Sequence, residues 1–374
     1  MRTTILLLIT CLLVSCKSPY TEDIEVTFLK IKWNKSYEED TIDKAVIGLE
    51  WALSYVGANT PCNASKNMQV SENTITLQTQ NIGFSPTANK VFEKLILKIK
   101  KTEAYRKNKT IDLGRFITLL LASPEHYYAL IETPKTLKQL KENYTLNPQK
   151  GYINNSSIGL QDRVIYFSEA SEFNQLWISE EIDSITKIIY EFETIELLKN
   201  GQLRFGIYDE KGIRKNVADK KHTKAGKPGK CIWCHESNLN QLFRDQKDVN
   251  GFLTTEALQQ KMIAARDTFH ANKKQLKYNV DYSKKQQHTL TELLYISFLE
   301  PSSQRLSLEW QMEEREVKKK LKGLKTHQHH EFPFLGDLYH RIDVAPFSPL
   351  KAIAVSGDVR EHSTQEVNHL TSDK

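Results

Sequence analysis

Cysteine and long apolar runs are scarce in this sequence of 374 residues. Its five cysteines are too few and too unevenly spaced for a disulfide framework, and no apolar run is long enough to span a membrane as a mature helix. Internal repeats, heptad arrays and long low-complexity tracts are also missing, and the sequence alone reveals no Ser-His-Asp triad and no catalytic pair of carboxylates. With 39% hydrophobic and 26% charged residues, the composition indicates a globular protein of one large or two modest domains.

The N-terminus has the pattern of an export signal, in which Arg2 precedes a short apolar run and a small residue. Leu13-Val14-Ser15-Cys16 resembles the lipobox of bacterial lipoproteins, which implies cleavage before Cys16 and its acylation. The chain would then contact the membrane through a lipid anchor. Lys17, and not an aspartate, follows the cysteine, which favours an outer-membrane or surface position in the bacterial envelope. The alternative is an ordinary cleaved signal with an incidental cysteine.

The most informative internal segment is Cys231-Ile232-Trp233-Cys234-His235. Two thiols three positions apart, followed at once by an imidazole, form the attachment pattern for covalent haem. Each thiol adds to one vinyl group of the porphyrin, so the sulfurs must lie about one helical turn apart. His235 then follows in the position of an axial iron ligand. Export supports this interpretation, because bacteria attach haem covalently outside the cytoplasm.

On these residues the chain resembles c-type cytochromes. The resemblance implies thioether bonds at Cys231 and Cys234, His235 as axial ligand, a single haem c and electron transfer as the activity. It covers about 231–345 and implies an atypical cytochrome-c-like haem domain in the C-terminal half. A predicted strand and a basic loop, and not an amphipathic helix with glycine and an aromatic, precede the motif. No Met-Pro distal loop follows it.

The sequence leaves the second axial ligand open between Met262 and His222. Met262 lies on a predicted helix at the spacing of a core methionine, and His222 lies nine residues before Cys231. Further candidates are Met312, His270, His288 and His340. A thioether ligand would raise the reduction potential relative to histidine, whereas an open position would suit a haem enzyme or a gas sensor. We therefore expect an electron carrier more than a catalyst, with the enzyme assignment open.

Two alternative interpretations of the motif involve no haem. A zinc site would need a fourth ligand, for which His222 is within reach, but adjacent Cys and His are awkward for tetrahedral closure. A redox dithiol or disulfide would match Cys-Xaa-Xaa-Cys, although the tryptophan lies inside this motif and not before it. A separate tract, His327-Gln328-His329-His330, could bind a metal ion such as copper or nickel or could simply be solvated.

The chain carries a formal charge of +6, and much of the excess lies just before the motif. Residues 211–230 hold eight basic side chains against one acidic one. Such a collar near the haem edge predicts an acidic redox partner protein, and a solvated loop is the alternative. Nucleic acid is not expected as a partner of an exported, lipidated chain.

The periodicity predicts an α+β fold, mostly helical with a minor sheet. Helices are expected over about 41–55, 89–101, 111–121, 134–144, 179–198, 254–272 and 306–324. Strands are expected over 26–33, 164–167 and 203–208, with weak alternation in 70–82. The expected divisions are a signal peptide (1–15), a lipidated tether (16–25), an N-terminal α+β domain (26–200), a haem-binding region (201–350) and a flexible tail (351–374).

Overall fold

The computed structural model describes residues 27–59, 67–80, 82–277, 280–284, 288–363 and 365–371. Helices account for 36% and strands for 18%, so the predicted α+β class is confirmed. The expected signal peptide, the tether with Cys16, and Cys62 lie outside the described residues. Among the described helices, none combines the length and the apolar character that crossing a membrane requires.

The helices are α1 (Ile42–Tyr55), α2 (Pro86–Lys100), α3 (Glu103–Asn108), α4 (Leu113–Leu121), α5 (Pro124–Leu130), α6 (Leu137–Lys141), α7 (Pro228–His235), α8 (Thr255–Lys273), α9 (His288–Leu299), α10 (Ser303–Trp310), α11 (Glu314–Lys320) and α12 (Arg341–Val344). The strands are β1 (Phe28–Lys32), β2 (Met68–Ser71), β3 (Thr74–Gln78), β4 (Ile111–Asp112), β5 (Gly151–Ile153), β6 (Asp162–Phe167), β7 (Leu176–Ile182), β8 (Ile189–Leu197) and β9 (Leu203–Asp209). Several helices begin where the sequence predicts, because side-chain oxygens of Thr41 and Thr254 accept N–H bonds from the first turns of α1 and α8.

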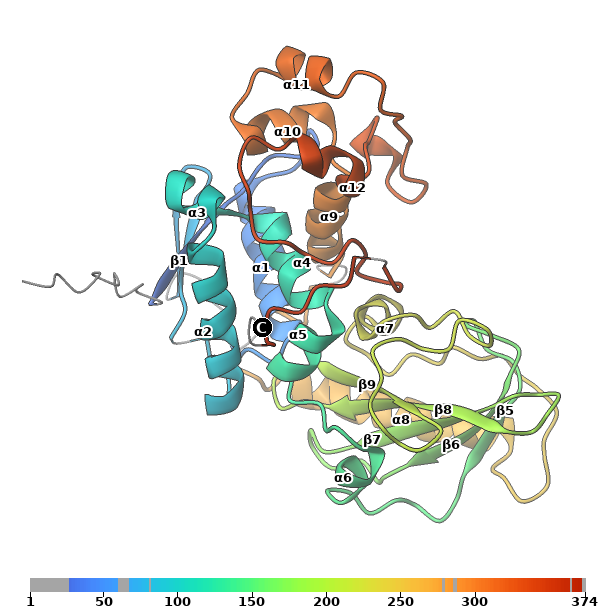
Figure 1. Cartoon of the computed structure of the whole chain (residues 1–374). Helices are drawn as coiled ribbons and strands as arrows, with labels where there is room; N and C mark the ends of the chain where they lie inside the picture. The colour runs from blue at the N-terminus through green and yellow to red at the C-terminus, as the bar shows by residue number, and fades with distance from the viewer. Residues whose placement is uncertain are drawn as a thin grey trace, which may run out of the picture.

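One region combines the helices α1, α2, α4, α5 and α9 with a four-stranded sheet of order β2-β3-β1-β4 (Figure 1). Its centre is α9, which packs against both α1 and α4. Two glycines allow this close approach. A Cβ at Gly48 of α1 would lie 2.6 Å from the Leu294 side chain, and one at Gly114 of α4 would overlap Phe298. The early and late parts of the chain thus share one core.

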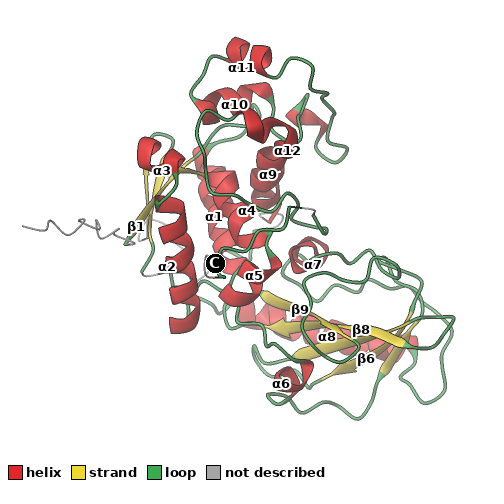
Figure 2. Ribbon diagram, in the orientation of Figure 1, coloured by secondary structure: helices red, strands yellow, loops and turns green. Residues whose placement is uncertain are grey.

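The second region is a five-stranded antiparallel meander of order β5-β6-β7-β8-β9 (Figure 2). Leu137 and Leu140 of α6 pack on one face, against Leu176 and Tyr208. The opposite face carries the alternate residues and is covered by α7 and α8. There Gly151 of β5 lets Leu258 of α8 approach the strand closely.

The helix predicted over 179–198 is wrong. The segment forms the end of β7, a turn and β8, which pair antiparallel with Ser179 opposite Glu193. Its glutamates favour a helix, but β-branched and aromatic residues alternate with them at the period of a strand. The boundary expected at residue 200 also falls inside this sheet, in the turn between the paired strands β8 and β9.

The C-terminal third differs from expectation in two further places. The helix predicted over 306–324 is two helices, α10 and α11, separated at Gln311, which has a left-handed φ of 54°. Helix α9 was not predicted at all. In the segment expected as a flexible tail, the described residues 351–363 and 365–371 form no helix or strand, yet Ile353, Ser356 and Val359 are buried.

Candidate haem-attachment site

The Cys-Xaa-Xaa-Cys-His motif forms the C-terminal part of α7 (Figure 1). Pro228 occupies the first turn, where its missing N–H is not needed, and Glu236 ends the helix with a left-handed φ of 50°. Because Cys231 and His235 are four residues apart on this helix, they lie on one face of it. Cys234 lies on a different part of the helix surface and is exposed.

Buried lysines hold both ends of α7. At the start, Lys227 Nζ donates to the Ala122 carbonyl (2.9 Å) and to the Asp358 carbonyl (2.7 Å). Just after the end, Lys273 Nζ of α8 donates to the Ser237 carbonyl at 2.5 Å. Burial lowers the pKa of Lys273 to about 7. These contacts fix the helix relative to α4, α8 and the C-terminal segment.

Residues 353–360, which we call the strap, cross the N-terminal end of α7. The Lys227 N–H donates to the Arg360 carbonyl at 2.8 Å. A Cβ at Gly226, whose φ is +71°, would overlap that carbonyl oxygen. A Cβ at Gly229 would lie 2.7 Å from the Val359 carbonyl oxygen. The two glycines before the motif are therefore required by the close passage of the strap.

A cavity of about 150 Å³ lies between α7, α8 and the covered face of the five-stranded sheet. We call it the CxxCH cavity. Cys231 and His235 of α7 and Met262 of α8 all line it. The remaining lining is mostly apolar and comes from the sheet and from the loop after α7; it includes Ile165, Ile195, Phe205, Ile207, Leu239, Leu242 and Phe243. Phe205 and His235 are in ring contact, with centroids 5.5 Å apart.

The polar groups of this cavity are poorly satisfied. Burial lowers the pKa of His235 to about 4, so its imidazole is neutral at physiological pH, and its buried Nδ1 has no hydrogen-bond partner. The buried Oε1 of Glu193 also lacks a partner. Burial, with the nearby Glu181 and Glu191 carboxyls, raises the pKa of Glu193 well above its usual value. Burial and then Glu193 raise the pKa of the Cys231 thiol as well.

No family model, no curated protein and no solved structure matches the chain. The chemistry of the site is therefore argued from its own residues.

The donors around the cavity form part of the set that a covalent haem needs. A neutral imidazole, a thioether and one of the two thiols face one apolar space, and the second thiol, Cys234, does not line it. The cavity is too small for a porphyrin as it stands. A volume of about 150 Å³ holds a benzene-sized molecule, and a porphyrin is several times larger. Residues 236–254 join α7 to α8 without regular structure and form one wall. A porphyrin requires this wall to move outward.

Cys234 does not line the CxxCH cavity. It lies beside a second hollow, next to a neighbouring part of the α7 surface, together with Lys230, Glu292 and Arg360. Burial raises the pKa of the Cys234 thiol, while Lys230 and Arg360 oppose the shift. The structure thus brings Cys231, His235 and Met262 together and leaves Cys234 accessible from outside.

His222 lies away from the cavity lining. Its Nε2 is 2.9 Å from Asp183 and its Nδ1 is 3.3 Å from Asp219. Its ring stacks on Tyr190 with centroids 4.3 Å apart. Both nitrogens face carboxylates, and among the described residues no group of three metal-binding side chains includes His222 together with Cys231 or His235.

Several basic side chains of the collar before the motif, residues 211–230, make contacts within the protein. Arg214 stacks on the Tyr128 ring, Lys215 pairs with Glu191, and Lys227 is buried. Lys230 pairs with Glu361. The exposed basic side chains of this segment are Lys211, Lys220, Lys221 and Lys224. About half of the predicted collar therefore remains available to an acidic partner.

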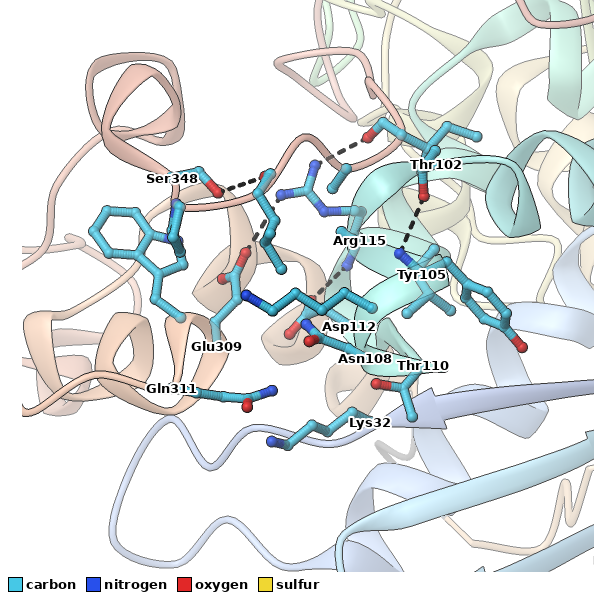
Figure 3. A pocket seen from close by; sticks show the side chains of 18 of the residues that line it. Lys32, Thr102, Tyr105, Asn108, Thr110, Asp112, Arg115, Glu309, Gln311 and Ser348 are labelled. Carbon is cyan, nitrogen blue, oxygen red and sulfur yellow. Dashed lines mark hydrogen bonds and ion pairs between the residues drawn. The ribbon is translucent and has the colours of Figure 1, made fainter.

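A polar cavity of about 220 Å³ lies far from the motif, between β1, the α3–α4 segment and α10 (Figure 3). Asp112, Arg115 and Glu309 project toward it, and they belong to a closed ion-pair network. Arg305 joins Asp112 at 2.8 Å and Glu309 at 2.6 Å. Because these charges largely neutralise one another, the network stabilises the helical region.

The sequence did not predict that strands line one side of the CxxCH cavity, and it did not identify Glu193 and Phe205 as lining residues. The usable signal was the alternation in 189–197, where Glu191 and Glu193 share one face with Ile195. Once this segment is read as a strand, acidic and apolar side chains point together toward the motif.

Proposed function

We propose that this chain carries one haem c and acts in electron transfer. The porphyrin would be attached through thioether bonds to Cys231 and Cys234, with His235 as an axial ligand of the iron. The observation that carries the proposal is that Cys231, His235 and Met262, from two separate helices, line one apolar cavity. A bound haem would supply a one-electron couple. The protein would supply the axial donors, a dry surrounding and a fixed orientation.

Met262 is the better supported distal ligand. It faces the same cavity as His235, whereas His222 is engaged by Asp183 and Asp219. Thioether ligation in an apolar pocket favours the reduced iron and a higher potential. The exposed lysines of 211–224 support an acidic redox partner protein.

The cellular setting we propose is that of a bacterial outer-membrane lipoprotein. It rests on the lipobox-like sequence ending in Cys16. Fractionation of cells tests this part by itself. The full-length chain should sediment with membranes, and Cys16→Ser should release it to the soluble fraction with the same haem content. Membrane association of the Cys16→Ser variant would contradict the lipid anchor and leave the haem proposal standing.

Covalent haem is tested by making the full chain in a host with haem-attachment machinery. We expect one haem per chain by mass spectrometry and a pyridine haemochrome spectrum of the c type. Cys231→Ser combined with Cys234→Ser should abolish covalent haem, while His222→Ala, a matched histidine outside the cavity, should retain it. A colourless wild-type protein, or stoichiometric zinc at the cysteines, would overturn the proposal.

A second function, a haem enzyme or gas sensor, is favoured by one observation. Glu193 and Arg163 place ionisable groups on the same cavity, and burial raises the pKa of Glu193, which favours its proton-donating form. Carbon monoxide binding to the reduced protein separates the two functions. A six-coordinate carrier should resist it and should become reactive after Met262→Leu. Rapid binding by the wild type, unchanged by Met262→Leu, would favour the open-site function.

A further inference from the structure

A cluster of metal-binding side chains lies in the helical region, apart from the CxxCH cavity. It consists of Glu300, His327 and His340. One donor atom from each lies within 4.8 Å of the others. His327 Nε2 is 2.9 Å from Glu300 Oε2, and the rings of His327 and His340 stack with centroids 4.2 Å apart. We propose that these three residues bind a divalent transition-metal ion, independently of the haem.

The backbone around the cluster is tied together by hydrogen bonds. His327 and Leu338 exchange two N–H to carbonyl bonds of 2.9 Å each. The Tyr339 N–H donates to the Pro301 carbonyl at 3.0 Å, which joins the neighbour of His340 to the neighbour of Glu300. Three segments distant in sequence are thereby held in one frame. A preformed frame reduces the ordering cost of binding an ion.

The side chains of the cluster are accessible to an ion from solution. Glu300 and His327 are 26% and 30% exposed, and His340 is exposed. The nearest cation along the chain is Arg341, whose guanidinium is turned inward to the Phe298 carbonyl (2.7 Å) and to Glu309 (2.9 Å). That side chain therefore does not neutralise Glu300 or occupy the site.

The donor set determines the class of ion. Two imidazoles and one carboxylate suit zinc, copper or nickel, whereas calcium and magnesium prefer oxygen donors alone. Three protein ligands leave a fourth position open. His329 and Glu300 line the same hollow, and backbone N–H groups of Glu331 and Phe332 donate to His329 Nδ1. His329 or a water molecule would complete the site.

A zinc titration of the full chain tests the proposal. The measurement uses calorimetry on chelator-treated protein, both as the wild type and with Cys231→Ser and Cys234→Ser, so that the thiols cannot account for the zinc. We expect one Zn²⁺ per chain in both forms. Co²⁺ in place of Zn²⁺ should give the visible absorption of a nitrogen- and oxygen-coordinated ion.

Matched variants locate the bound ion. His340→Ala and Glu300→Gln should each weaken zinc binding by about tenfold or more, because each removes one ligand. His330→Ala removes an exposed histidine of the same tract outside the cluster and should leave the affinity unchanged. Thermal unfolding without metal verifies that each variant is folded, and His340→Asn provides a second variant if His340→Ala is not. No binding, or an equal loss in His330→Ala, would overturn the proposal.

Discussion

The polar cavity of the helical region and the CxxCH cavity both contain buried carboxyl groups, with opposite environments. Burial alone would raise the pKa of Glu309, but Arg341, Arg305 and Arg115 outweigh it and hold that pKa well below its usual range. For Glu193, burial and the carboxyls of Glu181 and Glu191 outweigh the opposing effect of Arg163 and Lys215, and its pKa is raised. The first carboxyl is held in its charged form by a network of arginines, and the second faces a cavity where its protonated form is favoured.

Two buried histidines, one in each region, also differ in how their ring nitrogens are hydrogen-bonded. Burial lowers the pKa of both His126 and His235 to about 4, so both are neutral at physiological pH. His126 uses both nitrogens, since Nδ1 is 2.7 Å from the Leu119 carbonyl oxygen and Nε2 accepts the His369 N–H at 2.9 Å. The Nδ1 of His235 has no partner. Most buried polar groups in proteins are satisfied, and the unpartnered His235 Nδ1 and Glu193 Oε1 both belong to residues that line the CxxCH cavity, where a ligand would supply the partners they lack.

The largest expected change in the free energy of unfolding is at the buried ion-pair network of the helical region. Arg305→Met should lower the free energy of unfolding by about 3–5 kcal/mol, because it leaves buried Asp112 and Glu309 without a shared partner. Chemical denaturation measures the loss. Lys318→Met, which breaks the exposed pair with Glu314, should leave the denaturation curve close to that of the wild type. Similar losses in the two variants would mean that the buried network contributes little.

The two histidines should respond differently to the same substitution. His126→Leu should cost about 1–3 kcal/mol, because it leaves the Leu119 carbonyl and the His369 N–H without partners. His235→Leu in haem-free protein should change stability by about 1 kcal/mol or less, since no buried partner is stranded. Denaturation curves of both variants provide the measurement. An equal loss at the two positions would mean that His235, like His126, has buried hydrogen-bond partners.

The smallest effect near pH 5 is expected at Glu193. Its raised pKa means that the folded chain keeps a proton that the unfolded chain releases above about pH 4.5. The free energy of unfolding contributed by this group therefore falls as pH rises above that value. Glu193→Gln should lie within about 1 kcal/mol of the wild type near pH 5 and become relatively more stable as pH increases.

The control for this pH dependence is Glu210→Gln, at an exposed glutamate in a turn of the same region. Its stability should follow the wild-type pH curve. A Glu193→Gln curve parallel to the wild type would show that Glu193 is ionised in the folded protein.

Local signals in the sequence predicted several elements well. Threonine caps identified the starts of α1 and α8, and alternating apolar residues identified β9. Helix α9 escaped prediction because it packs between α1 and α4 and lacks the polar face that reveals a surface helix. The helix prediction over 179–198 is wrong because glutamate favours helices. Only the pairing of β8 with β7 and β9 shows that these glutamates belong to a sheet.

The candidate site was predictable only in part. The motif and Met262 could be named from the sequence, because they carry recognisable chemistry at recognisable spacing. Their shared cavity depends on the packing of α7 and α8 on one sheet face, which is a long-range property. For the same reason, the sequence could not choose between Met262 and His222, whose partner Asp183 lies 39 residues away.

The strap has a consequence for the order in which the molecule is assembled. Val359 and Arg360 are synthesised more than a hundred residues after α7, yet they cover its first turn and receive the Lys227 N–H. Until they emerge, the nascent chain cannot complete the surroundings of Cys231. Any enzyme that modifies this thiol would therefore meet it in a more open form before the strap packs onto α7 than in the folded protein.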